Sequence, residues 1–269
     1  AMYANAQTTA HTKPTGYVTH TLKAGQFNLI GLTLHNPVVA SGDIQGFTGG
    51  TQITDNDINF ANVLTAGKTY ILEITDAADT SLNGTIQEVT VWGANTFDTP
   101  QDLQAEGLAV GDKYQLRACK TISDIFGADN SAGLPAAASS AGSAVIWIQD
   151  VNETSGFAKF YYNTGGFGQA ATWKKINAGA SEVDVVASSV EIVYVDAIFV
   201  QMPSGSTDMD VVITGAVKVN ATSVVVDRPF NYVSGGFPVG STLQNSGLEN
   251  SLSTAASAAG SDIVWIQQV

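Results

Sequence analysis

Short apolar runs separated by turn residues make up most of the chain, and this pattern predicts β-strands. In the first half, the runs cover residues 17–22, 27–34, 44–47, 69–74, 85–92 and 113–119. In the second half, they cover residues 145–149, 157–163, 172–176, 189–202, 209–219 and 223–226. Within 113–119, Tyr114, Leu116 and Ala118 alternate with polar residues. A period of two places one face of a strand in a core and the other in water, as in an antiparallel sheet.

Turn and helix signals refine this pattern. Asn83-Gly84 separates two apolar runs and predicts a hairpin, because both residues tolerate positive φ. The segment 99–107 begins with Thr-Pro and ends with Gly, which predicts one or two turns of helix. Residues 121–127 and 135–141 are candidates for similar short pieces. The helices are therefore minor elements in a β protein.

The polar residues 1–15 lack a core pattern and predict an extended N-terminal arm, with Pro14 and Gly16 marking the entry to the first strand. We expect a first β domain at 16–120 and a second β region at 121–269. The predicted fold is all-β, an antiparallel sandwich or barrel-like sheets with a few short helices.

A repeated segment is the most informative feature of the chain. Residues 137–151 and 255–269 are identical at ten of fifteen aligned positions, including Trp147 and Trp265. In the first copy, a Gly-containing turn and the aromatic run 157–162 follow and could pair with the Trp strand, whereas the second copy has no such continuation in this sequence. An incomplete strand leaves backbone N–H and C=O groups unpaired and invites pairing with another chain. The repeat therefore predicts assembly rather than catalysis.

Charge argues against nucleic acid as a partner. The chain has 11 Lys and Arg against 24 Asp and Glu, for a net charge of −13, and its longest basic cluster is Lys174-Lys175. A surface that follows phosphates needs many more cations than this. Charged residues are only 13% of the chain, which is below the usual level of about 25% and typical of a low-charge β protein.

The chain also suggests a secreted product. Its longest apolar runs are of strand length and predict no transmembrane segment. The first residues lack the charged and apolar regions of a signal peptide, and we interpret Ala1-Met2-Tyr3 as the start of a processed chain. The single Cys119 excludes an intrachain disulfide. We therefore expect a secreted, extracellular or cell-surface location.

Candidate catalytic residues are few. His11, His20, His35 and Cys119 are the only routes to the common nucleophile and base pairs, and no nucleophile elbow or Cys signature surrounds them. Cys119 fits a small buried hydrophobe at a strand end. We predict that the chain is not an enzyme.

Two pairs of aspartates offer a partial calcium pattern. Asp55 with Asp57, and Asp208 with Asp210, place oxygen ligands two residues apart, but both lack the Gly and distal Glu of a complete loop. Capping of turns explains the same spacing. We expect no cofactor and no metal, with calcium as the alternative at these four residues.

Aromatic residues gather in and around the repeated unit. They could form a platform for stacking sugar rings, or they could fill a core or an interface. Their placement on strands favours core and interface. The residues are Trp147, Phe157, Tyr161, Tyr162, Phe167, Trp173 and Trp265.

Several segments resemble a secreted paralogous β-rich family of verrucomicrobial type that has no assigned biochemical activity. They are residues 15–19, 31–37, 68–75, 160–168 with Trp173-Lys174, and 231–240. The resemblance implies export, supplies no catalytic residues, and implies a Trp strand, a Tyr-rich strand and a Trp-Arg or Trp-Lys turn in two copies. This chain has Trp173-Lys174 once, so the resemblance also implies further residues after Val269.

We therefore expect an extracellular structural protein that self-assembles with identical subunits into a filament or surface layer on the bacterial surface. Strands would be added between subunits, in the manner of β-sandwich strand complementation. The alternative is a secreted carbohydrate-binding or adhesive β module with polysaccharide as its partner. The candidate interface residues are Met2, Tyr3, Ala4 and Ala6 in the arm and Ile263, Trp265, Ile266 and Val269 in the last strand.

Overall fold

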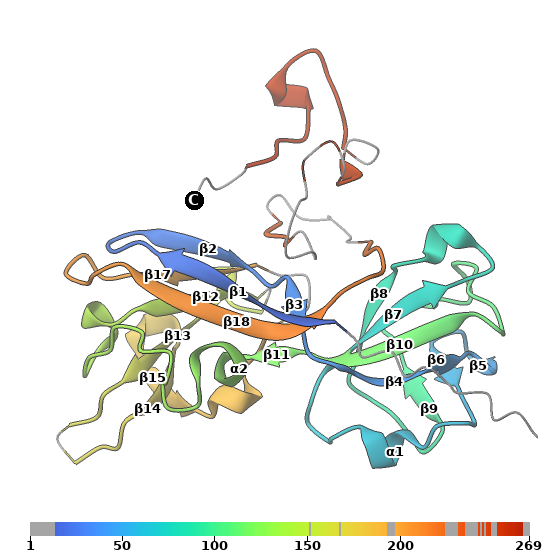
Figure 1. Ribbon diagram of the computed structural model, residues 1–269, viewed down its shortest axis with the longest axis horizontal. Helices are drawn as coiled ribbons and strands as arrows, with labels where there is room; N and C mark the ends of the chain where they lie inside the picture. The colour runs from blue at the N-terminus through green and yellow to red at the C-terminus, as the bar shows by residue number, and fades with distance from the viewer. Residues whose placement is uncertain are drawn as a thin grey trace, which may run out of the picture.

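Antiparallel sheets account for nearly all regular structure in the computed structural model (Figure 1). The structure describes residues 14–150, 152–166, 168–192, 197–223, 231–234, 242, 244, 246–248 and 252–265. Within these residues, the two α-helices are only four and five residues long. The predicted all-β class is confirmed. None of the helices in the described part of the chain has the length and apolar character that crossing a membrane requires.

One part of the molecule is a β-sandwich. Its six-stranded sheet has the order β15-β14-β13-β12-β17-β2, and its three-stranded sheet has the order β1-β18-β3. The strands are β1 (Thr15–Leu22), β2 (Phe27–Gly31), β3 (Leu34–His35), β12 (Val145–Gln149), β13 (Phe157–Asn163), β14 (Thr172–Ile176), β15 (Glu182–Val185), β17 (Ala197–Gln201) and β18 (Met209–Val217).

The alternation of apolar residues explains how the two sheets of the sandwich meet. Ile146 of β12, Phe160 of β13 and Ile213 of β18 all point into one buried cluster. Trp173 of β14 fills the same cluster, and its indole Nε1–H donates to Gly127 O at 3.0 Å. A buried indole needs such an acceptor, so Trp173 is held in place by packing and by a hydrogen bond.

A second core lies beside the sandwich, on the right in Figure 1. It is built from the sheets β4-β10-β7-β8 and β5-β6-β9. Phe60 and Phe97 meet edge to face in it, with ring centroids 5.2 Å apart. The elements are β4 (Val38–Asp43), β5 (Gly46–Thr48), β6 (Gln52–Thr54), α1 (Phe60–Val63), β7 (Tyr70–Asp76), β8 (Ile86–Val89), β9 (Thr96–Asp98) and β10 (Lys113–Ala118).

The predicted hairpin around Asn83-Gly84 is confirmed, since β7 and β8 pair antiparallel and Gly84 has φ of 88°. The connection is longer than a two-residue turn, because it includes the 3₁₀ turn η1 (Thr80–Leu82). On β10, Tyr114 and Leu116 face the core as predicted, but Gln115 is buried too. Its Nε2 donates to Glu73 Oε2 at 2.5 Å, so the second face of this sheet is covered and does not lie in water.

Short helical pieces connect the strands. Helix α2 (Ile122–Phe126) confirms the prediction at 121–127 and begins with a capping box formed by Thr121 and Asp124. The prediction at 99–107 was wrong, because this segment forms turns in which Asp102 Oδ1 accepts the Ala105 N–H at 2.8 Å. The remaining elements are β11 (Lys120–Thr121), η2 (Ser140–Gly142), η3 (Ala178–Ala180), η4 (Ala187–Ser189), β16 (Glu191–Ile192) and η6 (Ala258–Gly260).

The predicted domain boundaries need a correction. Residues 16–34 were assigned to the first domain and Thr15 to the arm, but β1, which begins at Thr15, pairs with β18, and β2 pairs with β17. Leu22 and Ile30 accordingly lie in the core of the sandwich. Residues 38–118 form the second core, and the chain returns to the sandwich after them. Predicted elements at 1–13 and 224–226 lie outside the described residues.

Candidate assembly interface

The first copy of the repeat folds as a tight connection that leads into a central strand. The Ala137 N–H donates to Ser143 Oγ at 2.9 Å, and Ser143 Oγ donates to Ser139 O at 2.9 Å. The Ala144 N–H then donates to Pro135 O at 2.7 Å. Strand β12 follows directly and pairs with β13 on one side and with β17 on the other.

The second copy repeats this connection bond for bond. The Ala255 N–H donates to Ser261 Oγ at 2.8 Å, Ser261 Oγ donates to Ser257 O at 3.1 Å, and the Asp262 N–H donates to Ser253 O at 3.0 Å. The backbone angles agree as well, with φ and ψ of −144° and 158° at Ser257 against −148° and 160° at Ser139. The local sequence therefore specifies the same fold twice.

The two copies differ in what surrounds the residues that follow. In the first copy, Val145 and Ile146 are buried, and Trp147 is half-buried. In the second copy, the equivalent Ile263, Val264 and Trp265 are 58%, 41% and 81% exposed. None of the described strands pairs with residues 262–265. In Figure 1, this red segment stands apart from the sheets.

The predicted interface residues fall into two groups. Ile263 and Trp265 are described, and both side chains are exposed. Met2, Tyr3, Ala4, Ala6, Ile266 and Val269 lie outside the described residues. The geometry of the candidate interface is therefore built on residues 252–265.

An aromatic cluster covers the outer face of the six-stranded sheet. Trp147 meets Phe27 and Phe157 edge to face, with centroid distances of 5.4 and 5.9 Å. Phe199 and Tyr232 extend the cluster, with ring centroids 4.8 Å apart. Phe27, Phe199 and Tyr232 were not predicted to join these rings, because they come from segments far apart in the chain and no local pattern connects them.

The arrangement of these rings limits what they can bind. Lys159 Nζ lies 4.0 Å from the Trp147 ring centroid and covers one face of that ring. The predicted preference of the aromatics for core positions is confirmed at Trp173 and Tyr161, which are buried, and Tyr162 packs against the core. Phe167 lies outside the described residues.

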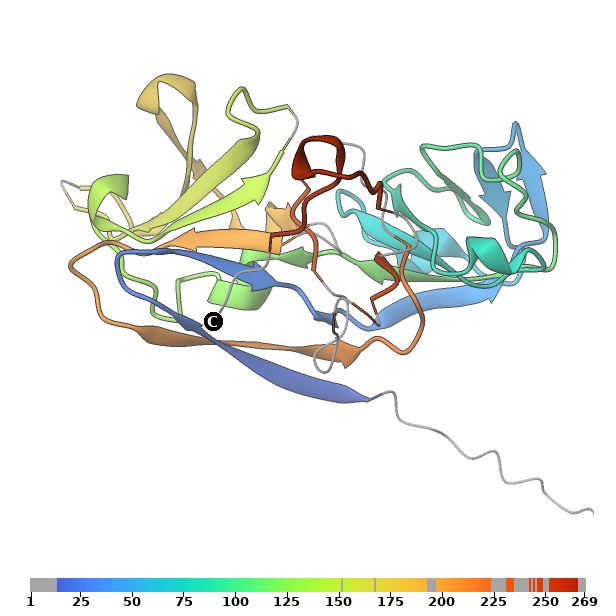
Figure 2. The same cartoon turned by 90° about the horizontal axis from the view of Figure 1, so that it is seen from above.

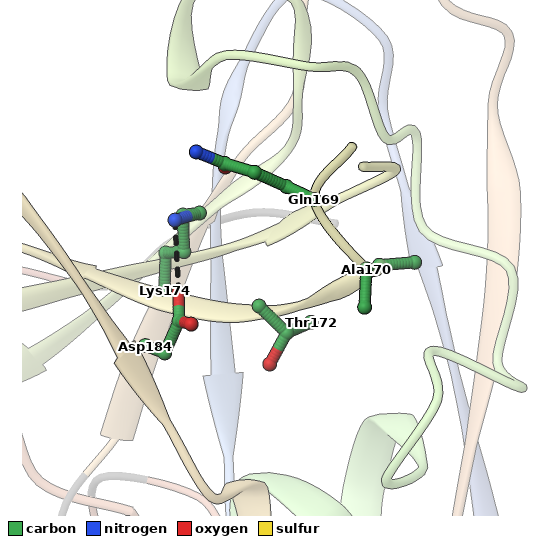
Figure 3. Close-up of a pocket in the computed structure, with 6 residues that line it drawn as sticks. Gln169, Ala170, Thr172, Lys174 and Asp184 are labelled. Atoms are coloured by element: carbon green, nitrogen blue, oxygen red, sulfur yellow. Dashed lines mark hydrogen bonds and ion pairs between the residues drawn. The ribbon is translucent and has the colours of Figure 1, made fainter. Parts of the chain in front are cut away.

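A hollow of about 430 Å³ opens beside the start of β14 (Figure 3). Its charged residues are Lys174 and Asp184, whose Nζ and Oδ1 atoms are 2.8 Å apart. The rest of its lining is Gln169, Ala170, Ala171 and Thr172. The two charges neutralise each other, and the other side chains are small or amidic. The hollow therefore offers no unpaired charge to a ligand.

Burial limits access to two of the candidate catalytic residues. His35 and Cys119 are buried, and His11 lies outside the described residues. The Nε2 atom of His20 is buried in β1 without a hydrogen-bond partner, and burial lowers the pKa of this imidazole. A substrate in solution does not reach His35 or Cys119 as they are placed here.

The four candidate calcium ligands bind protein donors. Asp55 accepts a hydrogen bond of 2.7 Å from the Tyr114 hydroxyl and one of 2.9 Å from the Asp57 N–H, and Asp57 Oδ2 accepts from Gln45 Nε2 at 2.6 Å. Asp208 accepts from the Ala24 N–H at 2.9 Å and from Lys23 Nζ at 3.1 Å, and Asp210 accepts from Thr21 Oγ1 at 2.6 Å. Among the described residues, no three His, Cys, Asp or Glu side chains gather at one point.

Comparison with known proteins adds no relative: the chain matches no protein-family model, no curated protein and no solved structure.

Proposed function

We propose that this chain is a secreted structural subunit that assembles with identical copies into an extracellular filament or surface layer by strand addition. The observation that carries the proposal is the contrast within the repeat. The connection at 253–262 folds like that at 135–144, yet the apolar residues 263–265 that follow it are exposed and pair with no described strand. A strand that a neighbouring subunit completes has these properties in the isolated subunit.

The side chains of residues 262–265, which we call the donor segment, can supply binding energy. Ile263, Val264 and Trp265 are all substantially exposed in the single chain. Full burial of one such apolar side chain contributes about 1.5–3 kcal/mol, against which the cost of ordering the segment must be set. The preformed turn around Ser261 lowers that cost, because the strand leaves it in a defined direction.

The symmetry of such a contact favours a polymer. The donor segment and an acceptor edge lie at different places on the subunit, so the contact is heterologous. A heterologous contact continues from subunit to subunit as a helical filament unless its rotation closes a ring.

A charged residue inside the donor strand tests the proposal. We expect Val264→Asp to reduce self-association sharply, because an added strand would have to bury an unpaired carboxylate. Val110→Asp is the matched control, since Val110 is 64% exposed and lies in a loop of the second core region. Sedimentation velocity and negative-stain microscopy over a range of concentrations give the readout. A wild-type chain that stays monomeric throughout would rule out polymerisation.

The aromatic cluster supports a second candidate function, a secreted carbohydrate-binding or adhesive module. Phe27 is half-exposed at the rim of this cluster and could contact a sugar ring. Retention on polysaccharide that is lost in Phe27→Ala but kept in Trp265→Ala would favour the module over the polymer.

A further inference from the structure

The outer strands of the sheets differ in how well they are protected against added strands. Edge strands commonly carry charges, which discourage pairing with other chains. Strand β4 carries Asp43, β8 carries Glu88, and β15 carries Glu182 and Asp184. Strand β1 has no Asp, Glu, Lys or Arg over its eight residues and is an edge of its sheet, where the blue strand lies beside the orange β18 in Figure 2.

The other uncharged edges offer less backbone. Strands β2, β3 and β5 are five, two and three residues long. The end of β2 is also crowded, because Ser234 lies against Gly31 and the Tyr232 O accepts the N–H of Ala197 on the neighbouring strand. Among the described strands, β1 is therefore the longest uncharged edge.

Burial along β1 indicates that the sandwich core is open at this edge. On β18, the inward-facing Val211 and Ile213 are fully buried. On β1, the inward-facing Val18 and His20 next to them remain only half-buried. A further strand alongside β1 would cover both side chains and continue the core.

The donor segment has the alternation that this edge requires. In the first copy of the repeat, Ile146 points into the core and Trp147 points outward into the aromatic cluster. Val264 and Trp265 hold the equivalent positions in the second copy. Placed beside β1, Val264 would cover Val18, while Trp265 would stand on the outer face with the exposed Tyr17.

We infer that the β1 edge of one copy receives residues 262–265 of a second copy. This inference rests on the proposed function and names its acceptor. A second copy is the occupant because the donor repeats a strand that this same fold already pairs on both sides, with the same alternation of buried and outward residues.

Disulfide trapping between two different variants tests the inference. Both variants carry Cys119→Ala, which removes the native thiol. One also carries Ile263→Cys in the donor, and the other carries Thr19→Cys at an exposed position of β1. The control acceptor is Val183→Cys on β15, which is an exposed position on another edge strand. Unchanged thermal unfolding of each variant confirms that it is folded.

We expect the mixture of Ile263→Cys and Thr19→Cys chains to give a disulfide-linked heterodimer on mild oxidation, in about tenfold higher yield than the mixture with Val183→Cys, because pairing raises the effective concentration of the thiols. A higher yield with Val183→Cys would overturn β1 as the acceptor and leave strand addition intact. If a chain that carries both Thr19→Cys and Ile263→Cys forms only an intrachain disulfide while remaining monomeric, the inference is overturned in favour of closure within one chain. Absence of any cross-link together with monomeric wild-type protein would remove the proposed function itself.

Discussion

Trp147 and Trp265 hold equivalent positions in two copies of one folded connection, but only Trp147 lies within a sheet. The serines that organise the two connections, Ser143 and Ser261, accept and donate matching hydrogen bonds. Trp147 packs between Phe27 and Phe157, whereas Trp265 is 81% exposed. The local sequence thus specifies the turn, whereas pairing of the residues that follow depends on which strands lie beside them.

This pair provides a matched test of stability against assembly. We expect Trp147→Ala to lower the free energy of unfolding by about 1–3 kcal/mol, because it removes the contacts of the Trp147 ring with Phe27 and Phe157. The loss is moderate because the ring is only half-buried. Trp265→Ala should change the stability of isolated subunits by less than about 0.5 kcal/mol, as exposed substitutions do. The measurement is urea unfolding at a concentration below that of assembly.

In an assembly assay, we expect the order of the two variants to be reversed, with the larger effect in Trp265→Ala. Trp265→Ala should weaken self-association measured by sedimentation velocity, while folded Trp147→Ala should retain it. Equal effects of both variants on association would show that the exposed Trp265 has no special role.

The close approach of two backbones at Gly215 gives a second prediction. A Cβ at this position of β18 would lie 2.5 Å from His35 O and 3.0 Å from His35 N. We expect Gly215→Ala to destabilise the protein by about 1–3 kcal/mol or more, because β3 would have to move away. Gly205→Ala is the control, since a Cβ there meets nothing within 4 Å. In thermal unfolding, Gly215→Ala should melt at a lower temperature than Gly205→Ala. Similar melting temperatures would show that β3 can shift without loss of stability.

Local patterns predicted the features that depend on neighbouring residues. The alternation at Tyr114 and Leu116 identified the core face of β10, and residues 121–127 were a candidate for the short helix that the structure shows as α2. Asn83-Gly84 marked the β7–β8 hairpin. In each case, the pattern that carries the prediction lies within a few residues along the chain, so the sequence contains it directly.

Features that depend on distant segments were not predictable in this way. The pairing of Thr15 with Ala216 moved β1 into the sandwich and changed the domain boundary. A period of two tells which face of a strand is apolar, but it does not tell which strand lies beside it. For the same reason, the aromatic cluster of Phe27, Trp147 and Phe199 emerged only from the arrangement of the sheets.

A buried ion pair joins the residue that follows β18 of the sandwich to β7 of the second core and gives a third prediction. Lys218 and Glu73 are both fully buried and in contact, and Lys218 Nζ also donates to Ala221 O at 2.7 Å. We expect Lys218→Met to cost about 3–5 kcal/mol, because it leaves the Glu73 carboxylate buried without its cation. Combining it with Glu73→Gln should recover part of that loss. A double-mutant cycle by urea unfolding measures the coupling, and strictly additive effects would contradict it.

His20 provides a fourth prediction, on the dependence of stability on pH. Burial lowers the pKa of His20 below its usual 6.5. At mildly acidic pH, this imidazole is therefore protonated to a greater extent in the unfolded chain than in the native chain. The unfolded state then binds more protons, and the contribution of His20 to the free energy of unfolding falls as the pH falls through about 6.5 toward the lowered native value. We expect His20→Val to lose less stability than the wild type between about pH 7.5 and 5.5, an interval in which most carboxylates are already ionised. Thr19→Val, which changes an exposed neighbour on the same strand, should keep the wild-type dependence. Urea unfolding of the three proteins at both pH values gives the comparison, and an identical loss in all of them would show that His20 stays neutral in both states or charged in both.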